Sequence, residues 1–296
     1  MRLRKLGIVA MEKITKMGLK MLEERFGGVV LMIDDTVLDK MWGKATVWVY
    51  RLYSSKHKRV IGGIDVVMLG AMVGKVRIPL RVAIYDRRVD GKSRMDIAME
   101  MLKWAIEDIG IKPEAVAMDA WYASKKILKY LQEKEVRFMA RIRKNRKVKL
   151  EGERKWVSVE DIGSAVPEEG MVVILRGVGP VRLFAFSPQT ITNGGQGEMR
   201  FYISNDVDIT REGIRELMRK RWQIEEMFRI LKKVFSLDKF FVRTTESILG
   251  FLGLALIGYM LGEKLRLLKG ITHYELQKLL RRRGRRALCY NPLFSI

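Results

Sequence analysis

The stretch VVLMIDDT, residues 29–36, decides the fold class. Its first five residues, Val29 to Ile33, are all apolar, and an unbroken apolar run of this length indicates a strand covered on both faces, as in the centre of an α/β sheet. The run ends abruptly in Asp34, Asp35 and Thr36. Carboxylates at the carboxyl end of a buried strand often carry the chemistry of open α/β sheets. Asp and Thr are also the usual residues of turns and helix caps, so both interpretations stay open at this point.

A second short apolar run, Ala115 to Met118, also ends in a carboxylate, Asp119. Strand–helix–strand connections within one sheet are nearly always right-handed and make successive buried strands parallel. If the strand over residues 29–33, the first of the chain, and the strand over residues 115–118, the fourth, are neighbours, Asp34 and Asp119 emerge side by side. The other elements predicted here are a hairpin of strands 60–69 and 76–85, a helix capped by Ser93 and closed by Gly110, a helix over 124–134 and a strand over 136–140.

The segments on either side of this region have different residue patterns. Residues 3–26 have apolar positions at helical spacing and predict a helix closed by Gly27 and Gly28. After a densely basic stretch, short β-rich pieces predict strands over 172–176, 181–186 and 200–204 and a loop over 192–197. The sequence therefore predicts a β-rich insertion.

The stretch MRKRWQIEEMFRILKK, Met218 to Lys233, predicts an amphipathic helix. Arg221, Glu225 and Lys232 are four and then seven residues apart, and both steps return to nearly one azimuth at about 100° per residue. A carboxylate between two cations suggests that something positive, such as a metal ion, sits against it; a solvated charged stripe is the alternative. The apolar face consists of Ile214, Leu217, Ile224, Phe228, Leu231 and Phe235.

The charge of the chain indicates a polyanionic partner. Its 296 residues contain 57 Lys and Arg against 34 Asp and Glu, a net charge of +23, which favours nucleic acid. A membrane surface is the competing polyanion. The uncharged apolar run over residues 247–262 is shorter than a usual membrane span of about 20 residues, and its glycines suit close packing, so we expect a buried core helix and no membrane.

The composition also limits the kinds of site. A single cysteine, Cys289, excludes an intramolecular disulfide, and with only two histidines, His57 and His273, no Cys/His zinc cluster is expected. Any metal must therefore be held by carboxylates, which points to Mg²⁺ or Mn²⁺. The amino end has no pattern of a signal peptide, so we expect a cytoplasmic protein.

Three carboxylates on two neighbouring strands and one helix make a site for two divalent cations. Such a pair, about 4 Å apart, activates the attacking oxygen and stabilises the leaving oxygen during in-line displacement at phosphorus. Arg221 is suited to a paired hydrogen bond with a phosphate, and Lys232 to contact as a point charge. The residues thus predict metal-dependent chemistry on a phosphodiester.

These motifs resemble those of the DDE transposases with a ribonuclease-H-like core, specifically the insertion-sequence-four group. Members of that group have Asp-x-Thr or Asp-x-Ser after the first strand and Asp after the fourth strand. They also have a helix with the pattern Tyr-x-x-Arg-x-x-x-Glu-x-x-x-x-x-x-Lys, and this chain resembles them in these motifs. The matching residues are Asp34 with Thr36, Asp119, and Arg221, Glu225 and Lys232, and the resemblance covers roughly residues 29–268. The signature tyrosine falls on Met218, which is a departure from the group.

The resemblance implies roles for the residues that match. It implies that Asp34, Asp119 and Glu225 are catalytic and hold two Mg²⁺ or Mn²⁺ ions. It also implies that Arg221 and Lys232 bind DNA near the scissile phosphate. The implied partner is double-stranded DNA, both element ends and target, bound by a homodimer that is associated with the nucleoid when on DNA.

Three further residues are secondary candidates. Asp35 is the alternative first ligand, although the group places Thr two residues after the ligand, which favours Asp34. Lys92, before the predicted helix, is placed to approach DNA or simply to be solvated. Trp222 belongs to the run Arg-Trp-x-Ile-Glu that is typical of the group.

The fold class implied is α/β, a ribonuclease-H-like mixed sheet flanked by helices, with a β-rich insertion before the last catalytic helix. The parts predicted are an amino-terminal helical segment (1–28), the first part of the catalytic core (29–141), the β-rich insertion (142–205), the second part of the core (206–268) and a basic carboxyl-terminal tail (269–296).

The predicted function is transposition of a DNA insertion sequence. It consists of divalent-metal-dependent phosphodiester hydrolysis at the element ends and transfer of the 3′-hydroxyl strand into target DNA. A ribonuclease-H-like nuclease or resolvase without strand transfer is one alternative. A catalytically decayed DNA-binding relative is another.

Overall fold

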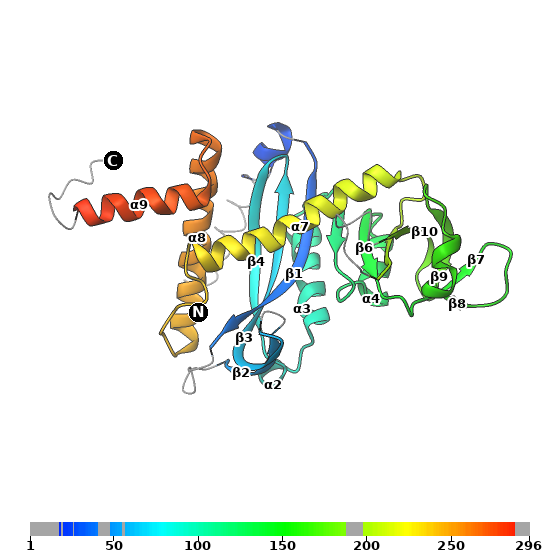
Figure 1. The fold of residues 1–296 in the computed structure, drawn as a ribbon, viewed down its shortest axis with the longest axis horizontal. Coiled ribbons are helices and arrows are strands. Elements are labelled where there is room, and N and C mark those ends of the chain that lie inside the picture. The colour runs from blue at the N-terminus through cyan, green and yellow to red at the C-terminus, as the bar shows by residue number, and fades with distance from the viewer. Residues whose placement is uncertain are drawn as a thin grey trace. The chain divides into compact units, whose positions relative to one another are not determined.

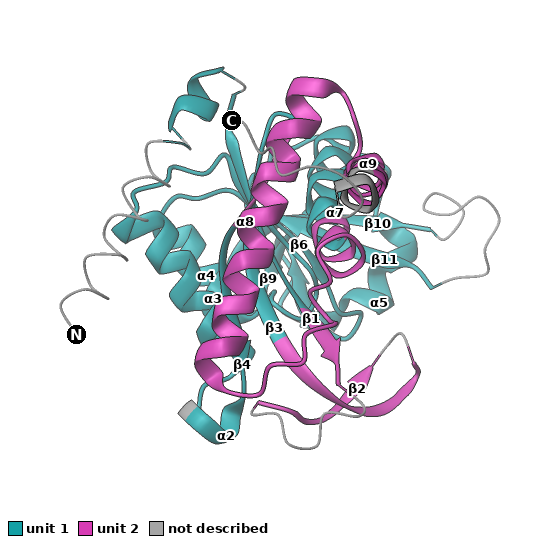
Figure 2. Cartoon of the chain, turned by 90° about the vertical axis from the view of Figure 1, so that its left-hand side faces the viewer, with its two compact units in different colours: residues 1–35, 66–75, 80–225 teal, residues 36–65, 76–79, 226–296 magenta. Residues whose placement is uncertain are grey.

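The structure is a computed structural model that describes residue 18 and residues 20–25, 27–40, 48–54, 57–187 and 198–287 (Figure 1). The chain divides into two compact units (Figure 2). The first comprises residues 1–35, 66–75 and 80–225, and the second residues 36–65, 76–79 and 226–296.

Three parallel strands form the centre of the first unit. β1 (Val29–Asp39) pairs with β5 (Ala115–Met118), which pairs with β6 (Phe138–Ile142). Ile33 of β1 lies opposite Met118 of β5, and the apolar run of β1 is completely buried. The predicted neighbourhood of the two apolar runs is confirmed, so the residues that follow them emerge at the same edge.

The strand β1 is longer than its apolar run. The sequence predicted an end at Ile33, whereas the strand continues through Asp34 to Asp39. Its neighbour β5 stops at Met118, but β1 keeps β3 on its other side. Asp34 therefore lies where one neighbouring strand has ended, rather than in a turn.

Antiparallel strands continue the sheet on the other side of β6, in the order β6-β11-β10-β9-β7-β8. Their bounds are β7 (Lys147–Leu150), β8 (Val157–Ser158), β9 (Met171–Leu175), β10 (Gly179–Phe186) and β11 (Arg200–Ser204). The strands predicted for the insertion are present as β9, β10 and β11, and they extend the sheet that contains β5. The loop predicted over residues 192–197 lies outside the described residues.

The strand β6 begins two residues later than predicted. The Asn205 side chain accepts a hydrogen bond from the Phe138 backbone N–H at 2.7 Å and donates one to the Val136 carbonyl at 3.0 Å. The Asn205 amide forms the backbone hydrogen bonds that a neighbouring strand was expected to form here, because one amide offers both a donor and an acceptor. The ladder consequently starts at Phe138.

The helices predicted between the core strands are present. α3 (Arg94–Lys103) begins at Ser93, whose side chain forms a capping box with Asp96. α4 (Lys125–Glu133) begins at Ser124, whose hydroxyl accepts from a backbone N–H in the first turn. The caps explain why both helices start where the sequence predicted.

The long helix α7 (Arg211–Lys233) contains the predicted amphipathic stretch. Five of the six apolar residues predicted for its inner face are buried, namely Ile214, Leu217, Ile224, Phe228 and Leu231. The sixth, Phe235, lies beyond the end of the helix. The apolar face at helical spacing is thus the face that packs.

The predicted hairpin is formed by β3 (Arg59–Val73) and β4 (Val76–Tyr85), joined through Gly74 at a φ of 56°. The positive φ suits glycine, which has no Cβ. Within the second unit, β2 (Tyr50–Ser54) pairs antiparallel with the start of β3.

Two helices complete the second unit, α8 (Thr245–Lys269) and α9 (His273–Ala287). Among the described residues, α8 is the one helix long and apolar enough to cross a membrane, with 33% of its apolar window buried; core helices of soluble proteins meet the same test. One side of the predicted core helix is buried, as at Ile248 and Leu252, while Leu254 is exposed.

The remaining described elements are short. They are α2 (Arg87–Asp90), a π-helical turn (Trp104–Asp108), α5 (Val159–Ile162) and a 3-10 turn (Gly163–Ala165). Of the helix predicted over residues 3–26, residues 20–25 are helical, and Gly27 closes it at a φ of 91° with its N–H on the Glu23 carbonyl. The rest of that helix and residues 288–296 of the predicted tail lie outside the described residues.

Candidate active site

In the first unit, Asp34 within β1 and Asp119 directly after β5 both follow the last residue pair of these strands, Ile33 and Met118. The register of Ile33 against Met118 brings the two carboxylates to one edge of the sheet. Burial and the nearby charge of Asp119 raise the pKa of Asp34 to about 7, against the opposing effect of Arg221. Burial therefore disfavours the charged form of the Asp34 carboxylate, even with Arg221 beside it.

Arg221 on α7 connects this edge to Glu225. Its guanidinium lies 3.5 Å from the Asp34 carboxylate and donates to Glu225 Oε1 at 2.5 Å. Burial opposes the charged form of Arg221, but Glu225 and the two strand aspartates outweigh it and raise the pKa of the guanidinium. Arg221 is thus the cation at the centre of the predicted acidic set.

The acidic set is not closed around a common point. Within the part of the chain that the structure describes, no three His, Cys, Asp or Glu side chains are grouped closely enough to hold a metal ion. The Arg221 guanidinium lies between Asp34 and Glu225. The donors nevertheless fit a hard cation, since all are carboxylate oxygens and a bound cation favours the charged form of Asp34, which burial disfavours.

Asp35 has different partners from Asp34. Its carboxylate accepts from the Tyr122 hydroxyl at 2.7 Å and lies 3.8 Å from the Arg94 guanidinium. Burial raises the pKa of Asp35, with these two partners acting against the shift. Successive side chains of a strand point to opposite faces, which explains why two adjacent aspartates have separate surroundings.

The loop after β5 is organised by Asp119 itself. Its Oδ1 accepts from the backbone N–H groups of Trp121 at 2.9 Å and Tyr122 at 3.1 Å. Tyr122 is fully buried, and its hydroxyl reaches Asp35. One carboxylate oxygen thereby holds the loop in shape, as an Asp does in an Asx-turn.

Lys232 has partners within the second unit. Its ammonium donates to the Thr36 hydroxyl at 2.6 Å and to the Val37 carbonyl at 2.9 Å. The sequence predicted contact with phosphate for this lysine, and the free protein instead directs it to the backbone of β1. Thr36, part of the Asp-x-Thr motif, is therefore a hydrogen-bond partner of Lys232.

The other two secondary candidates, Lys92 and Trp222, lie at the surface. Lys92 pairs with Glu100 of α3 at 2.7 Å, and both side chains are about half exposed. Trp222 is 43% exposed on α7, next to Arg221. These positions give Lys92 a structural partner and leave the Trp222 ring accessible.

Met218 lies at the position where the signature described above has tyrosine, and its surroundings suit an apolar side chain. It packs against a buried cluster of the first unit that includes Ala117, Phe186 and Leu217. A flexible thioether fills gaps in such a core without needing a polar partner. The position is apolar here.

Sequence reasoning missed Tyr122, Arg94 and Trp121 as parts of this region. The signal available was the pair Trp121-Tyr122 directly after a strand-end aspartate, since two large aromatics in a loop need a reason. Tyr122 and Arg94 hold Asp35, while Trp121 is 47% exposed beside the site.

The sequence pattern of the transposase DDE domain matches residues 27–261. The chain belongs to the transposase DDE domain family. No curated protein sequence matches it.

Comparison with solved structures agrees on the fold of this DDE domain. It is similar to piggyBac transposase in a cryo-EM synaptic complex with hairpin DNA, at 14% identity and a TM-score of 0.54, over 92% of this chain and 57% of that one. The chain thus spans little more than half the length of that relative. Endonuclease V of Ciona intestinalis, solved with inosine-containing DNA, is a more distant match, at 10% identity and a TM-score of 0.31, over 74% of this chain and 99% of that one.

The fold class predicted from the sequence is therefore confirmed: a ribonuclease-H-like mixed sheet flanked by helices, with a β-rich insertion before α7. The family shown by the sequence pattern is that of the transposase DDE domain.

Proposed function

We propose that this chain is the transposase of a DNA insertion sequence of the insertion-sequence-four group. It hydrolyses a phosphodiester at the element ends and joins the freed 3′-hydroxyl to target DNA. The observation that carries the proposal is that Asp34 and Asp119 follow the last residue pair of two adjacent parallel strands, while Arg221 links Asp34 to Glu225. Three distant parts of the chain thus supply the carboxylates of the proposed site.

We propose that Asp34, Asp119 and Glu225 hold two divalent ions, Mg²⁺ or Mn²⁺. When bound, such ions activate the attacking oxygen and stabilise the leaving oxygen of an in-line displacement. The all-oxygen donor set and the raised pKa of Asp34 support this assignment. In the free protein one oxygen of Glu225 accepts from Arg221, so a metal ion competes with the guanidinium for this carboxylate.

Arg221 and Lys232 are proposed to contact the DNA backbone. A phosphate competes with Glu225 for Arg221, since both offer the paired oxygens that a guanidinium prefers. Lys232 acts as a point charge from the same helix, while Trp222 and Lys92 add contacts at the surface. DNA binding therefore releases Glu225 from Arg221.

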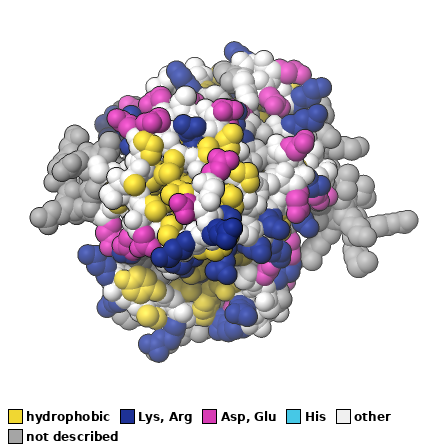
Figure 3. Space-filling model, turned by 90° about the vertical axis from the view of Figure 1, so that its right-hand side faces the viewer, with side chains coloured by type: hydrophobic (Ala, Val, Ile, Leu, Met, Phe, Trp, Pro, Cys, Tyr) yellow, Lys and Arg dark blue, Asp and Glu magenta, His cyan; other side chains and the backbone are white. Residues whose placement is uncertain are grey.

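The proposed partner is double-stranded DNA, and the net charge of +23 supports it. Figure 3 shows Lys and Arg side chains gathered across one face of the molecule, beside apolar side chains. We propose that two copies act together on two element ends, that the protein is cytoplasmic and associated with the nucleoid on DNA, and that it does not use a membrane.

The test is cleavage of DNA by purified protein with Mn²⁺ or Mg²⁺. The substrates are a supercoiled plasmid carrying the sequences that flank the reading frame, and a duplex with a free 3′-hydroxyl from the same flank. Glu225→Gln and Asp119→Asn should lose nicking and joining, with the parent fold. Glu216→Gln, which changes an exposed carboxylate on the same helix, should keep both.

Each other outcome of this experiment indicates a different function or a different site. Nicking without joining of the 3′-hydroxyl indicates a nuclease or resolvase. Metal-independent, salt-sensitive DNA binding that is unchanged by Asp119→Asn, with no nicking, indicates a decayed relative. Equal activity of Glu225→Gln and the parent contradicts the proposed site.

A further inference from the structure

The two halves of α9 have different surroundings within the second unit. The first half packs: His273 and Leu276 are buried, and the Gln277 amide donates to a backbone carbonyl at the end of α7 at 3.1 Å. The residues from Lys278 to Arg282 are all exposed. Figure 1 shows the carboxyl half of α9 leading away from α8. This half of the helix therefore has a surface that no other described element of the second unit covers.

The exposed half of α9 is densely cationic. The stretch KLLRRRGRR, residues 278–286, contains no carboxylate. The nearest carboxylate along the helix, Glu275, accepts from the Thr272 backbone N–H at 2.6 Å as part of the helix start. The cations are Lys278, Arg281, Arg282, Arg283, Arg285 and Arg286. Their charges are therefore not balanced within this half of the helix.

The spacing of these cations places most of them on one side of the helix. Residues three, four, seven and eight positions apart lie on one side at about 100° per residue. Lys278, Arg281, Arg282, Arg285 and Arg286 have this spacing and form what we call the α9 stripe. The buried His273 and Leu276 lie about 150° around the helix from the middle of the α9 stripe. The cationic side of α9 is consequently opposite to the side that packs.

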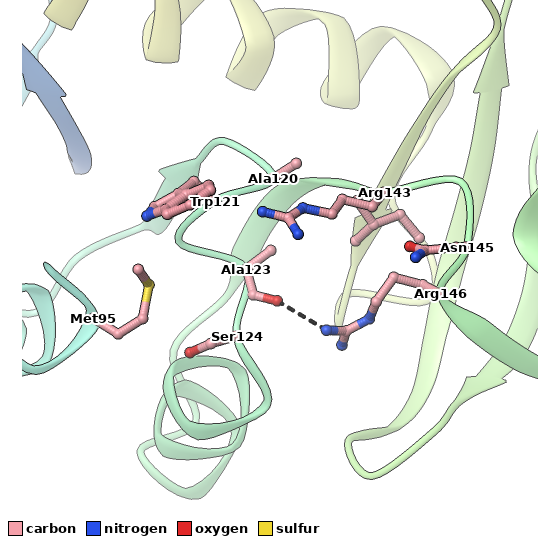
Figure 4. A pocket seen from close by; sticks show the side chains of 9 residues that line it. Met95, Ala120, Trp121, Ala123, Ser124, Arg143, Asn145 and Arg146 are labelled. Atoms are coloured by element: carbon pink, nitrogen blue, oxygen red, sulfur yellow. Dashed lines mark hydrogen bonds between the residues drawn. The ribbon is translucent and has the colours of Figure 1, made fainter. Parts of the chain in front are cut away.

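Arg146 of the first unit shows how this fold uses an arginine internally. It donates to the Ala123 carbonyl at 3.3 Å and lines a pocket of about 300 Å³ beside Trp121, which adjoins the candidate active site (Figure 4). Arg281 and Arg282 differ from it, since neither forms a hydrogen bond or an ion pair with another described residue. Their guanidinium groups remain available to a partner outside the chain.

Repulsion within the exposed half disfavours the helix unless an anion is present. Like charges four residues apart destabilise a helix, and Gly has a low helix propensity. Three such charge pairs flank or precede Gly284, namely Lys278 with Arg282, Arg281 with Arg285 and Arg282 with Arg286. The helix dipole favours cations only in the last turn. A polyanion that neutralises these charges therefore stabilises this half of α9.

Duplex DNA fits the α9 stripe better than a membrane surface does. Residues 278–286 span about 13 Å as a helix, and a duplex presents a phosphate about every 1.7 Å of its axis, so several cations contact phosphates at once. A helix that binds a membrane surface needs an apolar side opposite its cations. In α9 that side packs within the protein, as the buried Leu276 shows, and Leu279 and Leu280 are the exposed leucines that remain.

We propose that the carboxyl half of α9 is a second DNA-binding element, which holds the phosphate backbone of a duplex without reading its sequence. It belongs to the second unit, whereas Asp34, Asp119 and Glu225 belong to the first. Contacts of arginine and lysine with phosphates fix a protein on DNA but carry no base information. The element therefore anchors DNA of any sequence, and it does not depend on the roles proposed for the three carboxylates.

The experiment measures duplex binding without catalysis. Fluorescence anisotropy follows two labelled blunt duplexes of equal length and unrelated sequence, in EDTA at several salt concentrations, with the full-length protein. Arg281→Gln/Arg282→Gln should reduce the slope of log K against log salt by about 1.8 on both duplexes, about 0.9 for each lost phosphate contact. Arg281→Lys/Arg282→Lys keeps both charges and should keep the parent slope.

Lys129→Gln/Lys264→Gln is the matched control. Both lysines are exposed and lie on other helices, α4 and α8. This variant also removes two positive charges, so general attraction between a basic protein and DNA predicts the same change for both pairs. The proposal predicts the parent slope for the lysine pair. Since all four residues are exposed, the thermal unfolding curves should match that of the parent.

Three results on duplex DNA would overturn the proposal. They are the parent slope in Arg281→Gln/Arg282→Gln, an equal change in the lysine pair, and a change on only one of the two duplexes, which would indicate base readout. Loss of binding to phosphatidylserine vesicles, with duplex binding unchanged, would assign α9 to a membrane surface instead. Because the assay contains no metal and follows no cleavage, its failure leaves the Glu225→Gln test of the proposed function standing, and the reverse also holds.

Discussion

Arg221 donates to Glu225 one turn further along α7, with 2.5 Å between guanidinium nitrogen and carboxylate oxygen. The same guanidinium lies 3.5 Å from Asp34. In the free protein a protein cation therefore holds the position between two predicted metal ligands. The acidic set is balanced by Arg221 until something displaces it.

The first prediction follows from this balance. Arg221→Ala should bind Mn²⁺ more tightly than the parent in the absence of DNA, by about fivefold or more, since a charge pair at this distance is worth on the order of 1 kcal/mol or more. Isothermal titration calorimetry measures the change. Arg219→Ala removes an exposed arginine of the same helix and should behave as the parent. Weaker Mn²⁺ binding by Arg221→Ala would show that Arg221 organises the site rather than occupying it.

A second prediction concerns Lys232, which donates to Thr36 and Val37 in the free protein. If DNA draws the ammonium to a phosphate, Lys232→Met should reduce the salt dependence of duplex binding by about one counterion, a change of about 0.9 in the slope of log K against log salt. Lys232→Arg should keep the slope. Anisotropy titrations at several salt concentrations decide this, and an unchanged slope in Lys232→Met would restrict the lysine to a structural role.

The third prediction concerns the buried carboxylate of the second unit. Glu263 is 1% exposed and accepts from Arg266 at 2.8 and 2.9 Å and from the Arg77 backbone at 3.0 Å. These hydrogen bonds and charges outweigh burial and lower the pKa of Glu263. Glu263→Ala leaves two guanidinium groups without their partner, so the free energy of unfolding should fall by about 3–5 kcal/mol.

Urea denaturation measures that fall. Glu246→Ala, at an exposed position in the first turn of α8, should change stability by less than about 0.5 kcal/mol. A loss for Glu263→Ala as small as that of the control would show that the buried network is dispensable.

The fourth prediction uses the capping box of α3. Hydrogen bonds from the Ser93 hydroxyl and from Lys126 lower the pKa of Asp96 to about 2 from its ordinary value of 3.8. Because the pKa is lower in the folded state, this carboxylate stabilises the fold above about pH 4, and the contribution is lost as the pH falls from about 4 to about 2.

Asp96→Asn should therefore lower stability near neutral pH by about 1 kcal/mol, the usual value of a helix cap, and the difference from the parent should shrink as the pH falls below about 4. Urea denaturation at several pH values measures it. Glu133→Gln, at an exposed position on α4, is the control and should show little effect. A difference that stays constant down to about pH 3 would contradict the assignment.

Much of the core could be predicted from local patterns. The run Val29 to Ile33 is apolar at every position because both faces of β1 are covered, and Ala115 to Met118 repeats the pattern in β5. Helix starts followed from the hydroxyls of Ser93 and Ser124, which satisfy free N–H groups. These features depend on neighbours in sequence, so the sequence is sufficient.

Boundaries that depend on distant residues could not be predicted in this way. β1 continues past its apolar run because β3 remains beside it, and β6 starts late because Asn205, far along the chain, takes its first hydrogen bonds. The insertion was predicted as a β-rich segment, but its strands join the core sheet through the pairing of β6 with β11.

The candidate site divides in the same way. Spacing and strand ends are local properties, so the amino-acid sequence alone predicts that Asp34 and Asp119 follow two apolar runs and that Glu225 lies on a helix. The position of Arg221 between Asp34 and Glu225, and the pocket beside Trp121 next to Asp119, are known from the folded chain alone. Pairing of charges and exposure of a ring are set by which surfaces meet, and no local pattern records that.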